Sequence, residues 1–344
     1  MKIEQLGEFG LIERIRSALP EPGPNVVVGI GDDVAVLEAS AESVWLATCD
    51  VQVEGAHFLR EAIAPRSLGR KALAINLSDI ASAGGIPRYA LVSLGIPDGL
   101  EVGFIDELYA GLRDEGSSFG VEIVGGNLSR SRLGMFIDVF VLGEAVRDNI
   151  VLRSGAAPGD RIMVTGRLGD AAAGVALLLN NSLSAEETYA AVARERRDTP
   201  TPRVREGALI GALRQATAMI DVSDGLAGDL RHICEKSGVS VRLDAAKLPV
   251  DPENRALSRS AHGDEWHFAL HGGEDYELLF TAPPGRAERL AQRITSETGT
   301  PVTIIGDIIP AGEPAQLMLP GGGSAVLDES GWDHFAVTEK AGGK

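Results

Sequence analysis

The chain has 344 residues, of which 44% are hydrophobic and 24% charged, and it carries a formal net charge of −17. This balance is typical of a folded globular protein with room for two domains. The acidity excludes nucleic acid and anionic membranes as main partners, because both require a concentrated Lys/Arg surface.

Cysteine usage and the start of the chain indicate the cellular compartment. Two cysteines, Cys49 and Cys234, form neither a disulfide framework nor a thiolate zinc site. The first residues lack a basic start followed by an apolar run, and no stretch approaches the roughly 20 apolar residues of a membrane span. We therefore expect a cytoplasmic protein in a reducing environment.

The first half of the chain predicts strands and helices in mixed order. Leu73, Leu77 and Ile80 recur at helical spacing, and Gly84 and Gly85 supply the stop of that helix. A second helix is expected at 102–116. Strands, the first three of them antiparallel neighbours, are expected at 26–30, 34–38, 43–49, 121–126 and 135–143.

The second half begins near residues 144–149, which predicts one domain over 1–146 and another over 147–344. Residues 194–203 contain charges and two prolines and are expected to form an exposed connector. Leu226, Leu230 and Ile233 mark the apolar stripe of a further helix. The remaining expected elements are strands at 161–166 and 216–222, a helix at 170–179 and a glycine-rich loop at 320–324.

Acidic residues recur at the ends of the expected strands. Asp221, Ser223 and Asp224 stand where a strand passes into a helix, a position that often carries ligand groups. Taken alone, Asp224 is explained equally well as a helix cap, and Asp229 as a solvated helix residue. Similar positions are held by Asp32, Asp33 and Asp50, and by Asn76 and Asp79, which share one helical face with Ala72 and Ala83.

A site for several cations explains these carboxylates together, because they would otherwise repel one another or take up protons. Mg²⁺ is expected, since the chain has no calcium loop and no His/Cys spacing for zinc. Cations also invert the local charge and so favour an anionic substrate with phosphates. Gly125 and Gly126, followed by Ser129, Arg130 and Ser131, fit either a phosphate site or an ordinary tight turn, and no P-loop motif occurs.

Several strings combine in a specific order and spacing: GIGDDVAVLE, CDVQVEGAHF, KALAINLSDIASAGG, VGGNLSRS, LRSGAAPGD, DVSDGLAGDL, LHGGEDYELLF and GWDHF. Over residues 7–335 they resemble the thiamine-phosphate kinase family, within the superfamily that includes aminoimidazole ribonucleotide synthetase. The resemblance implies ATP-dependent phosphorylation of thiamine phosphate to thiamine diphosphate, with ADP as the other product, by direct in-line transfer.

The resemblance also implies an α+β and α/β two-domain architecture. The N-terminal domain is expected to be a ferredoxin-like α+β unit that binds ATP and Mg²⁺ and dimerises through its sheet. The C-terminal domain is expected to be an α/β unit of the aminoimidazole ribonucleotide synthetase C-terminal type that completes the phosphate and substrate site. The expected partners are thiamine phosphate, ATP, several Mg²⁺ ions and a second copy of the chain.

Site residues follow by matching this chain to the family motifs. The implied metal positions are Asp33, Thr48, Cys49, Asp50, Asp79, Asn127, Asp221 and Asp224. The implied nucleotide positions are Tyr109, Gly126, Asn127, Arg153 and Ser223. The implied substrate positions are His57, Glu274 and Trp332, each of which would otherwise be read as a packed or solvated residue. Arg153 is expected to share developing charge, and no general base is assigned, because a phosphate with a second pKa near ~6 is mostly dianionic at neutral pH.

Two positions depart from the family pattern. Many members carry Thr where this chain has Cys49 and Asp where it has Asn127. A thiol is a poor Mg²⁺ ligand, so Cys49 is expected to contribute only its backbone oxygen, and Asn127 keeps an oxygen but loses a charge. We expect weaker binding of one metal ion.

Two alternatives stay open. One keeps the fold and the ATP site but changes the acceptor; the GGEDYE and GWDHF strings at the substrate end argue against it. The other is a non-catalytic nucleotide or metal sensor. Retention of the aspartates at 33, 50, 79, 221 and 224 argues against that reading.

Overall fold

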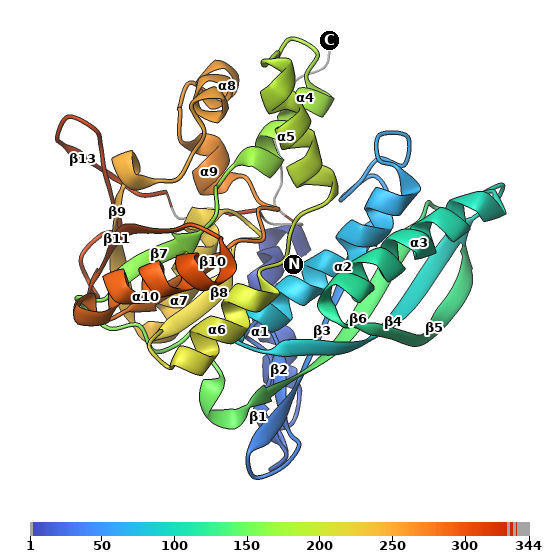
Figure 1. The fold of residues 1–344 in the computed structure, drawn as a ribbon, viewed down its shortest axis with the longest axis horizontal. Coiled ribbons are helices and arrows are strands. Elements are labelled where there is room, and N and C mark those ends of the chain that lie inside the picture. Colours follow the sequence, from blue (N-terminus) through green and yellow to red (C-terminus); the bar gives the residue numbers. More distant parts are fainter. Residues whose placement is uncertain (1–2, 329–330, 333–334, 336–344) are drawn as a thin grey trace.

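The computed structural model describes residues 3–328, 331, 332 and 335, and it contains two sheets, one in each half of the chain (Figure 1). The N-terminal sheet has the order β1-β2-β3-β6-β4-β5, in which β4 and β5 are parallel and the other neighbouring pairs are antiparallel. The antiparallel pairing expected of the first three strands is thereby confirmed. The bounds are β1 Val26–Val28, β2 Ala35–Glu38, β3 Ser43–Val53, β4 Ile86–Pro97, β5 Glu122–Ser131 and β6 Phe136–Val146.

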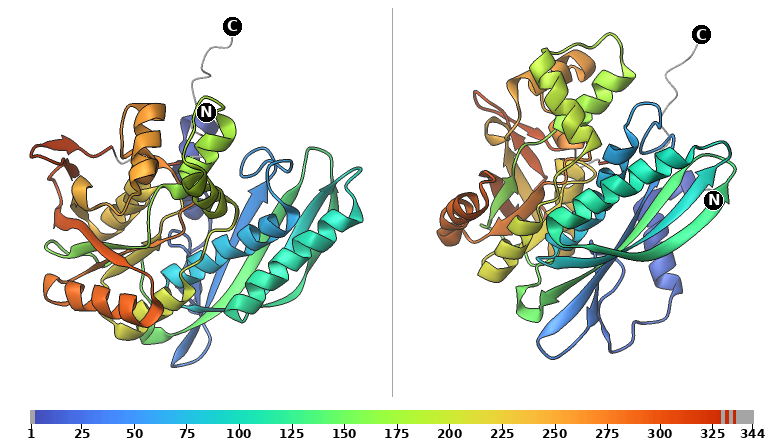
Figure 2. Two further views of the ribbon diagram at one scale, coloured as in Figure 1. Left: turned by 45° about the horizontal axis from the view of Figure 1, so that its top comes forward. Right: turned by 45° about the vertical axis from the view of Figure 1, so that its right-hand side comes forward.

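Two long helices, α2 (Pro65–Ser82) and α3 (Val102–Phe119), cover one face of this sheet (Figures 1 and 2). Pro65 occupies the first turn of α2, where a missing N–H costs nothing, and Gly84 follows the helix with φ +75°. The α+β prediction is confirmed. The order of the central elements, β3-α2-β4-α3-β5-β6, differs from the ferredoxin order, because α3 connects two parallel strands and β6 then inserts between β3 and β4.

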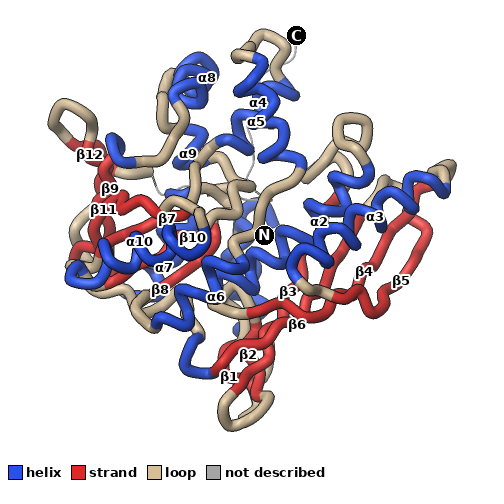
Figure 3. The backbone as a smooth tube through the Cα atoms, viewed as in Figure 1, coloured by secondary structure: helices blue, strands red, loops and turns tan. Residues whose placement is uncertain are grey.

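The C-terminal sheet has seven strands in the order β13-β12-β9-β11-β7-β10-β8, drawn in red in Figure 3. Helices lie against it and above it, as expected of an α/β domain. The strands are β7 Arg161–Thr165, β8 Ala218–Asp221, β9 Val239–Asp244, β10 Leu278–Ala282, β11 Val302–Pro310, β12 Gln316–Met318 and β13 Ser324–Val326. The α-helices of this half are α4 Asp170–Leu179, α5 Glu187–Asp198, α6 Val204–Leu213, α7 Leu226–Ser237, α8 Pro252–His262, α9 His267–His271 and α10 Pro284–Thr298. The remaining helical elements are α1 Gly7–Ala18 and the 3₁₀ turns at Ile3–Gln5, Arg147–Asn149 and Ala245–Lys247.

Helix α2 joins the two halves. It packs on β3 and β6 on one side and on α6 and β8 on the other. The buried core follows this arrangement, because one apolar cluster runs from Leu73 and Val92 in the first half to Met163 and Phe280 in the second. Polar side chains on α2 are therefore held rigidly between the two sheets.

The prediction that residues 194–203 form an exposed connector is wrong. Its first half belongs to α5, and Arg197 and Arg203 are each only 9% exposed. Arg203 is buried because its guanidinium forms two hydrogen bonds with Glu277, at 2.6 and 2.5 Å. The polar composition of this segment predicted exposure, but pairing with a carboxylate far along the chain buries Arg203 instead. Among the residues that the structure describes, every helix is too short or too polar to cross a bilayer.

Candidate active site

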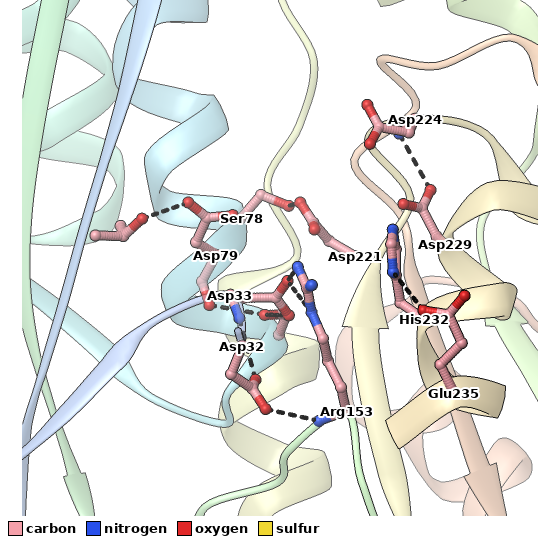
Figure 4. Close-up of polar contacts among 12 residues, drawn as sticks. Asp32, Asp33, Ser78, Asp79, Arg153, Asp221, Asp224, Asp229, His232 and Glu235 are labelled. Carbon is pink, nitrogen blue, oxygen red and sulfur yellow. Dashed lines mark hydrogen bonds and ion pairs between the residues drawn. The ribbon is translucent and has the colours of Figure 1, made fainter. Parts of the chain in front are cut away.

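Three carboxylates from separate elements converge between the two sheets. Asp33 lies in the turn before β2, Asp79 on α2 and Asp221 at the end of β8, and one oxygen from each lies within 4.8 Å of the others. Figure 4 shows the three side chains pointing toward one another. Three oxygen ligands at this spacing suit a hard divalent cation.

Hydroxyl groups orient each of these carboxylates. Ser82 donates to Asp33 at 2.6 Å and Ser78 donates to Asp221 at 2.5 Å. Thr48 of β3 donates to Asp79 at 2.7 Å. The three carboxylates therefore keep fixed positions, and the second oxygen of Asp33 accepts from Arg153.

A stripe of three buried polar residues runs along α2. Lys71, Ser78 and Ser82 stand at i, i+7 and i+11, which places them within about 40° of arc on the helix. Each contacts an acidic residue from elsewhere in the chain, since Lys71 forms a 2.6 Å ion pair with Glu274. Sequence reasoning missed this stripe; its signal was three polar residues at helical spacing along α2.

Burial and repulsion disfavour ionisation of Asp79 and Asp221. Burial, and then the charge of Asp33, raises the pKa of Asp221 to about 8. Burial also raises the pKa of Asp79 well above its usual range, with Asp50 and Asp221 adding to the effect. A bound cation would reverse these effects, so the donor set fits Mg²⁺.

Arg153 is the cation closest to this cluster in the described contacts. Its Nε donates to Asp33 Oδ1 at 2.9 Å, and its backbone N–H donates to Asp32 at 3.2 Å. Burial, and then the neighbouring Asp33, raises the pKa of Asp32 to about 6. The structure thus brings Arg153 to the carboxylates, and its expected role in nucleotide binding stays a prediction.

Strand β3 contributes residues to both faces of the sheet. Asp50 faces α2, and its backbone N–H donates to Asn76 Oδ1 at 2.8 Å. Cys49 pairs with Phe140 on the opposite, open face, so its thiol points away from the carboxylates. Burial raises the pKa of the Cys49 thiol, which further disfavours a thiolate ligand.

The turn from β8 to α7 differs from expectation in two ways. Helix α7 has Gly225 as its N-cap with no side-chain cap, so Asp224 does not cap it. Asp229 is not solvated but 1% exposed, and it accepts the backbone N–H of Asp224 at 3.1 Å. Burial raises the pKa of Asp229 well above its usual range. Figure 4 places Asp224 beside Asp229, apart from the three converging carboxylates.

The expected substrate residues border the site on two sides. His57 follows β3, and its Nδ1 accepts the Val53 N–H at 3.0 Å, so a neutral ring carries its proton on Nε2. Glu274 lies in the loop between α9 and β10, with its N–H donating to Ser223 O at 2.8 Å. Trp332 is 53% exposed, and its backbone N–H donates to Asp224 O at 3.1 Å.

Three of the residues expected to bind nucleotide or metal lie on α3 and β5. Tyr109 is half-buried on α3 and packs against the first core cluster. Gly126 and Asn127 lie on the edge strand β5, and Asn127 aligns through Ser93 and Asp138 with Val51 on the open face. Three strand spacings separate Asn127 from β3, about 14 Å. Asn127 is therefore distant from the carboxylates of its own chain, and its expected role in metal and nucleotide binding stays a prediction.

Comparisons with known proteins agree with this geometry. Models of the AIR synthase related protein N-terminal and C-terminal domains match residues 31–145 and 157–315. A thiamine-monophosphate kinase from Salmonella typhimurium is 38% identical, with 96% of this chain and 99% of that protein aligned. The chain belongs to the thiamine-monophosphate kinase family.

Further relatives of this family support the assignment. The thiamine-monophosphate kinase from Aquifex aeolicus is 39% identical, covering 83% of this chain and 89% of that protein. The solved structure "AaThiL complexed with AMPPCP and TMP" superposes with a TM-score of 0.82 at 36% identity, over 97% of this chain and 99% of that one. The same two-domain fold occurs in a hydrogenase maturation protein, HypE in complex with ATP, with a TM-score of 0.69 at 21% identity. The two-domain fold of the family is therefore present throughout this chain.

Proposed function

We propose that this protein transfers the γ-phosphoryl group of ATP to thiamine phosphate, forming thiamine diphosphate and ADP. The observation that carries the proposal is the convergence of Asp33, Asp79 and Asp221 beside Arg153. Such a site attracts cations first and phosphates second. The family relatives named for this activity, and the related structure with AMPPCP and TMP, supply the substrate class.

The metal-binding part of the proposal uses oxygen donors of this chain. Bound Mg²⁺ ions would supply positive charge that offsets repulsion between the two phosphate-bearing substrates. The side chains that would hold them are Asp33, Asp50, Asp79, Asp221 and Asp224, with Thr48 and the backbone oxygen of Cys49 beside them. Ser78 and Ser82 keep two of the carboxylates oriented.

Phosphoryl transfer then follows from positioning. An oxygen of the thiamine phosphate attacks the γ-phosphorus, the bond from that phosphorus to the β–γ bridging oxygen breaks, and ADP leaves in line with the attack. The attacking oxygen is already deprotonated near neutral pH, so no side chain acts as a general base. Arg153 exchanges Asp33 for phosphate oxygens and shares their charge. Ser223, two residues beyond Asp221, borders the nucleotide phosphates.

The thiamine moiety lies between His57, which follows β3, and Glu274 and Trp332, which lie at the turn after β8. His57 contributes its imidazole ring, whose Nδ1 accepts the Val53 N–H. The exposed indole of Trp332 stacks on the pyrimidine ring. Glu274 supplies a polar contact from the loop before β10.

Two copies of the chain pair through the open face of the N-terminal sheet. Val51, Val53, Leu91 and Phe140 are each at least 37% exposed on strands β3, β4 and β6. An apolar surface of this kind on a sheet is typical of a protein interface. Asn127 lies on the same face, so pairing is the arrangement in which it takes part in nucleotide binding.

The direct test is incubation of the purified protein with ATP, Mg²⁺ and thiamine phosphate, followed by oxidation of thiamine diphosphate to its fluorescent thiochrome. Thiamine replaces thiamine phosphate as a control acceptor. We expect product from thiamine phosphate and none from thiamine. ATP binding without product from thiamine phosphate would overturn the proposed acceptor.

A further inference from the structure

Lys71 is a buried cation on the face of α2 that meets the C-terminal half. Its side chain is 3% exposed, and Nζ lies 2.6 Å from Glu274 Oε1. A buried ammonium group is costly without a partner, so this ion pair is what permits Lys71 in the core. None of the proposed catalytic steps uses Lys71.

The backbone of Glu274 is fixed independently of that ion pair. Glu274 has φ +67°, a conformation that non-glycine residues seldom adopt, and its N–H donates to Ser223 O at 2.8 Å. A Cβ on the preceding residue, Gly273, would lie 2.1 Å from the same oxygen. Tyr276, at φ +50°, repeats the anchoring through a 2.8 Å bond to Val222 O. The Glu274 loop is therefore held against the turn that follows Asp221.

Helix α2 sets the span between the two ends of the site. Lys71 holds Glu274 and Ser78 holds Asp221, and seven residues of helix separate these anchors by about 10 Å. Both anchors are buried in the same helix, so the span is rigid. On the proposed function, thiamine phosphate reaches from the metal-binding carboxylates to the Glu274 side chain.

We propose that Lys71 is a positioning residue that determines specificity by neutralising Glu274. On this proposal, which rests on the proposed function, Glu274 accepts a hydrogen bond from the pyrimidine amino group of the substrate rather than serving as counter-ion to the thiazolium. Lys71 contacts Oε1 and compensates the carboxylate charge, so little attraction is left for the ring cation. A carboxylate has about four acceptor sites, so directional acceptor capacity remains.

The test compares KM values for thiamine phosphate and for its analogue in which an uncharged thiophene replaces the thiazolium. We expect the wild-type KM values to differ by less than about threefold. In Lys71→Met, uncompensated Glu274 attracts the ring cation, so selectivity for thiamine phosphate over the neutral analogue rises at least tenfold, while KM for ATP changes less than twofold. Arg70→Met is the matched control, because Arg70 is the adjacent residue and pairs with Glu115 at 2.9 Å. It should leave the selectivity unchanged.

A second variant keeps the test decisive if Lys71→Met fails to fold. The double variant Lys71→Met/Glu274→Gln removes both charges of the buried pair, so it should raise KM for thiamine phosphate and for the neutral analogue by the same factor, because only the hydrogen bond to the substrate changes. A loss confined to thiamine phosphate would identify Glu274 as a counter-ion and overturn the role of Lys71. A wild-type KM much higher for the neutral analogue than for thiamine phosphate, with the same ratio in Lys71→Met, would also overturn the role of Lys71. No turnover of thiamine phosphate by the wild type would overturn the proposed function itself, and this inference with it.

Discussion

The Arg153 guanidinium donates to Asp33 through Nε at 2.9 Å, so a proposed phosphate-binding cation is bound to a proposed metal ligand. Both side chains are mostly buried, at 19% and 2% exposure. On the proposed function, Arg153 and a metal ion compete for the same carboxylate. Binding of the metal–nucleotide complex would then require Asp33 to exchange Arg153 for the metal.

Arg153→Met should bind Mn²⁺, a paramagnetic substitute for Mg²⁺, about tenfold more tightly in the absence of nucleotide, a change of about 1.4 kcal/mol. The reason is that Asp33 loses its competing cation. The same variant should lose at least about 100-fold in kcat/KM for ATP, as the phosphates lose a guanidinium. Electron paramagnetic resonance titration of free Mn²⁺ measures the first effect.

The control for this experiment is Arg147→Met, since Arg147 pairs with Glu38 at the surface. It should change neither quantity. Unchanged Mn²⁺ affinity in Arg153→Met would show that the Arg153–Asp33 pair does not compete with the metal.

Asp221→Asn should abolish turnover while stabilising the metal-free protein. The pKa of Asp221 is raised from 3.8 to about 8, chiefly by burial. A carboxyl with a raised folded-state pKa favours folding fully only below its unfolded pKa. Stability of the metal-free wild type should therefore fall as pH rises from about 4 to about 8, and this slope should diminish in Asp221→Asn.

Thermal unfolding in the presence of a chelator, at several pH values, measures this slope. Saturating Mg²⁺ should restore the wild type at pH 8 and have little effect on the variant. If stability falls equally with pH in both proteins, the raised pKa of Asp221 is contradicted. Wild-type turnover in Asp221→Asn would exclude Asp221 from the proposed metal site.

Trp332→Ala should raise KM for thiamine phosphate about tenfold and leave KM for ATP within about twofold. The indole is 53% exposed, and its loss removes roughly 1–2 kcal/mol of ring stacking. Trp332→Phe keeps an aromatic face and should recover most of the affinity. Equal increases in KM for both substrates would show that Trp332 packs against the Asp224 turn and does not stack on the pyrimidine ring.

Leu91→Glu should convert a dimer into monomers, because it places a charge in the middle of the open face of the N-terminal sheet. Leu91 is 40% exposed and aligns with Phe140 on the neighbouring strand. Val102→Glu, at a 76% exposed position at the start of α3, is the control and should remain dimeric. Sedimentation velocity distinguishes the two states, and a Leu91→Glu dimer would exclude this face as the interface.

Much of the architecture could be predicted from sequence because helices and strands depend on short-range patterns. The helix at residues 170–179 and the strand-to-helix passage after Asp221 lie where the spacing of apolar residues predicted them. The convergence of Asp33, Asp79 and Asp221 was predicted from their repeated place at strand ends and on one helical face. The position of the domain boundary at 146/147 stays a prediction.

The sequence by itself determined the elements, the family motifs and the supply of carboxylates. Only the tertiary structure decided which of these meet. Asn127 belongs to one of the family motifs but lies about three strand spacings from β3, while Lys71 belongs to no predicted site yet contacts Glu274. Strand order and the burial of charged side chains depend on partners far along the chain, such as Arg203 and Glu277, and no local pattern encodes those distances.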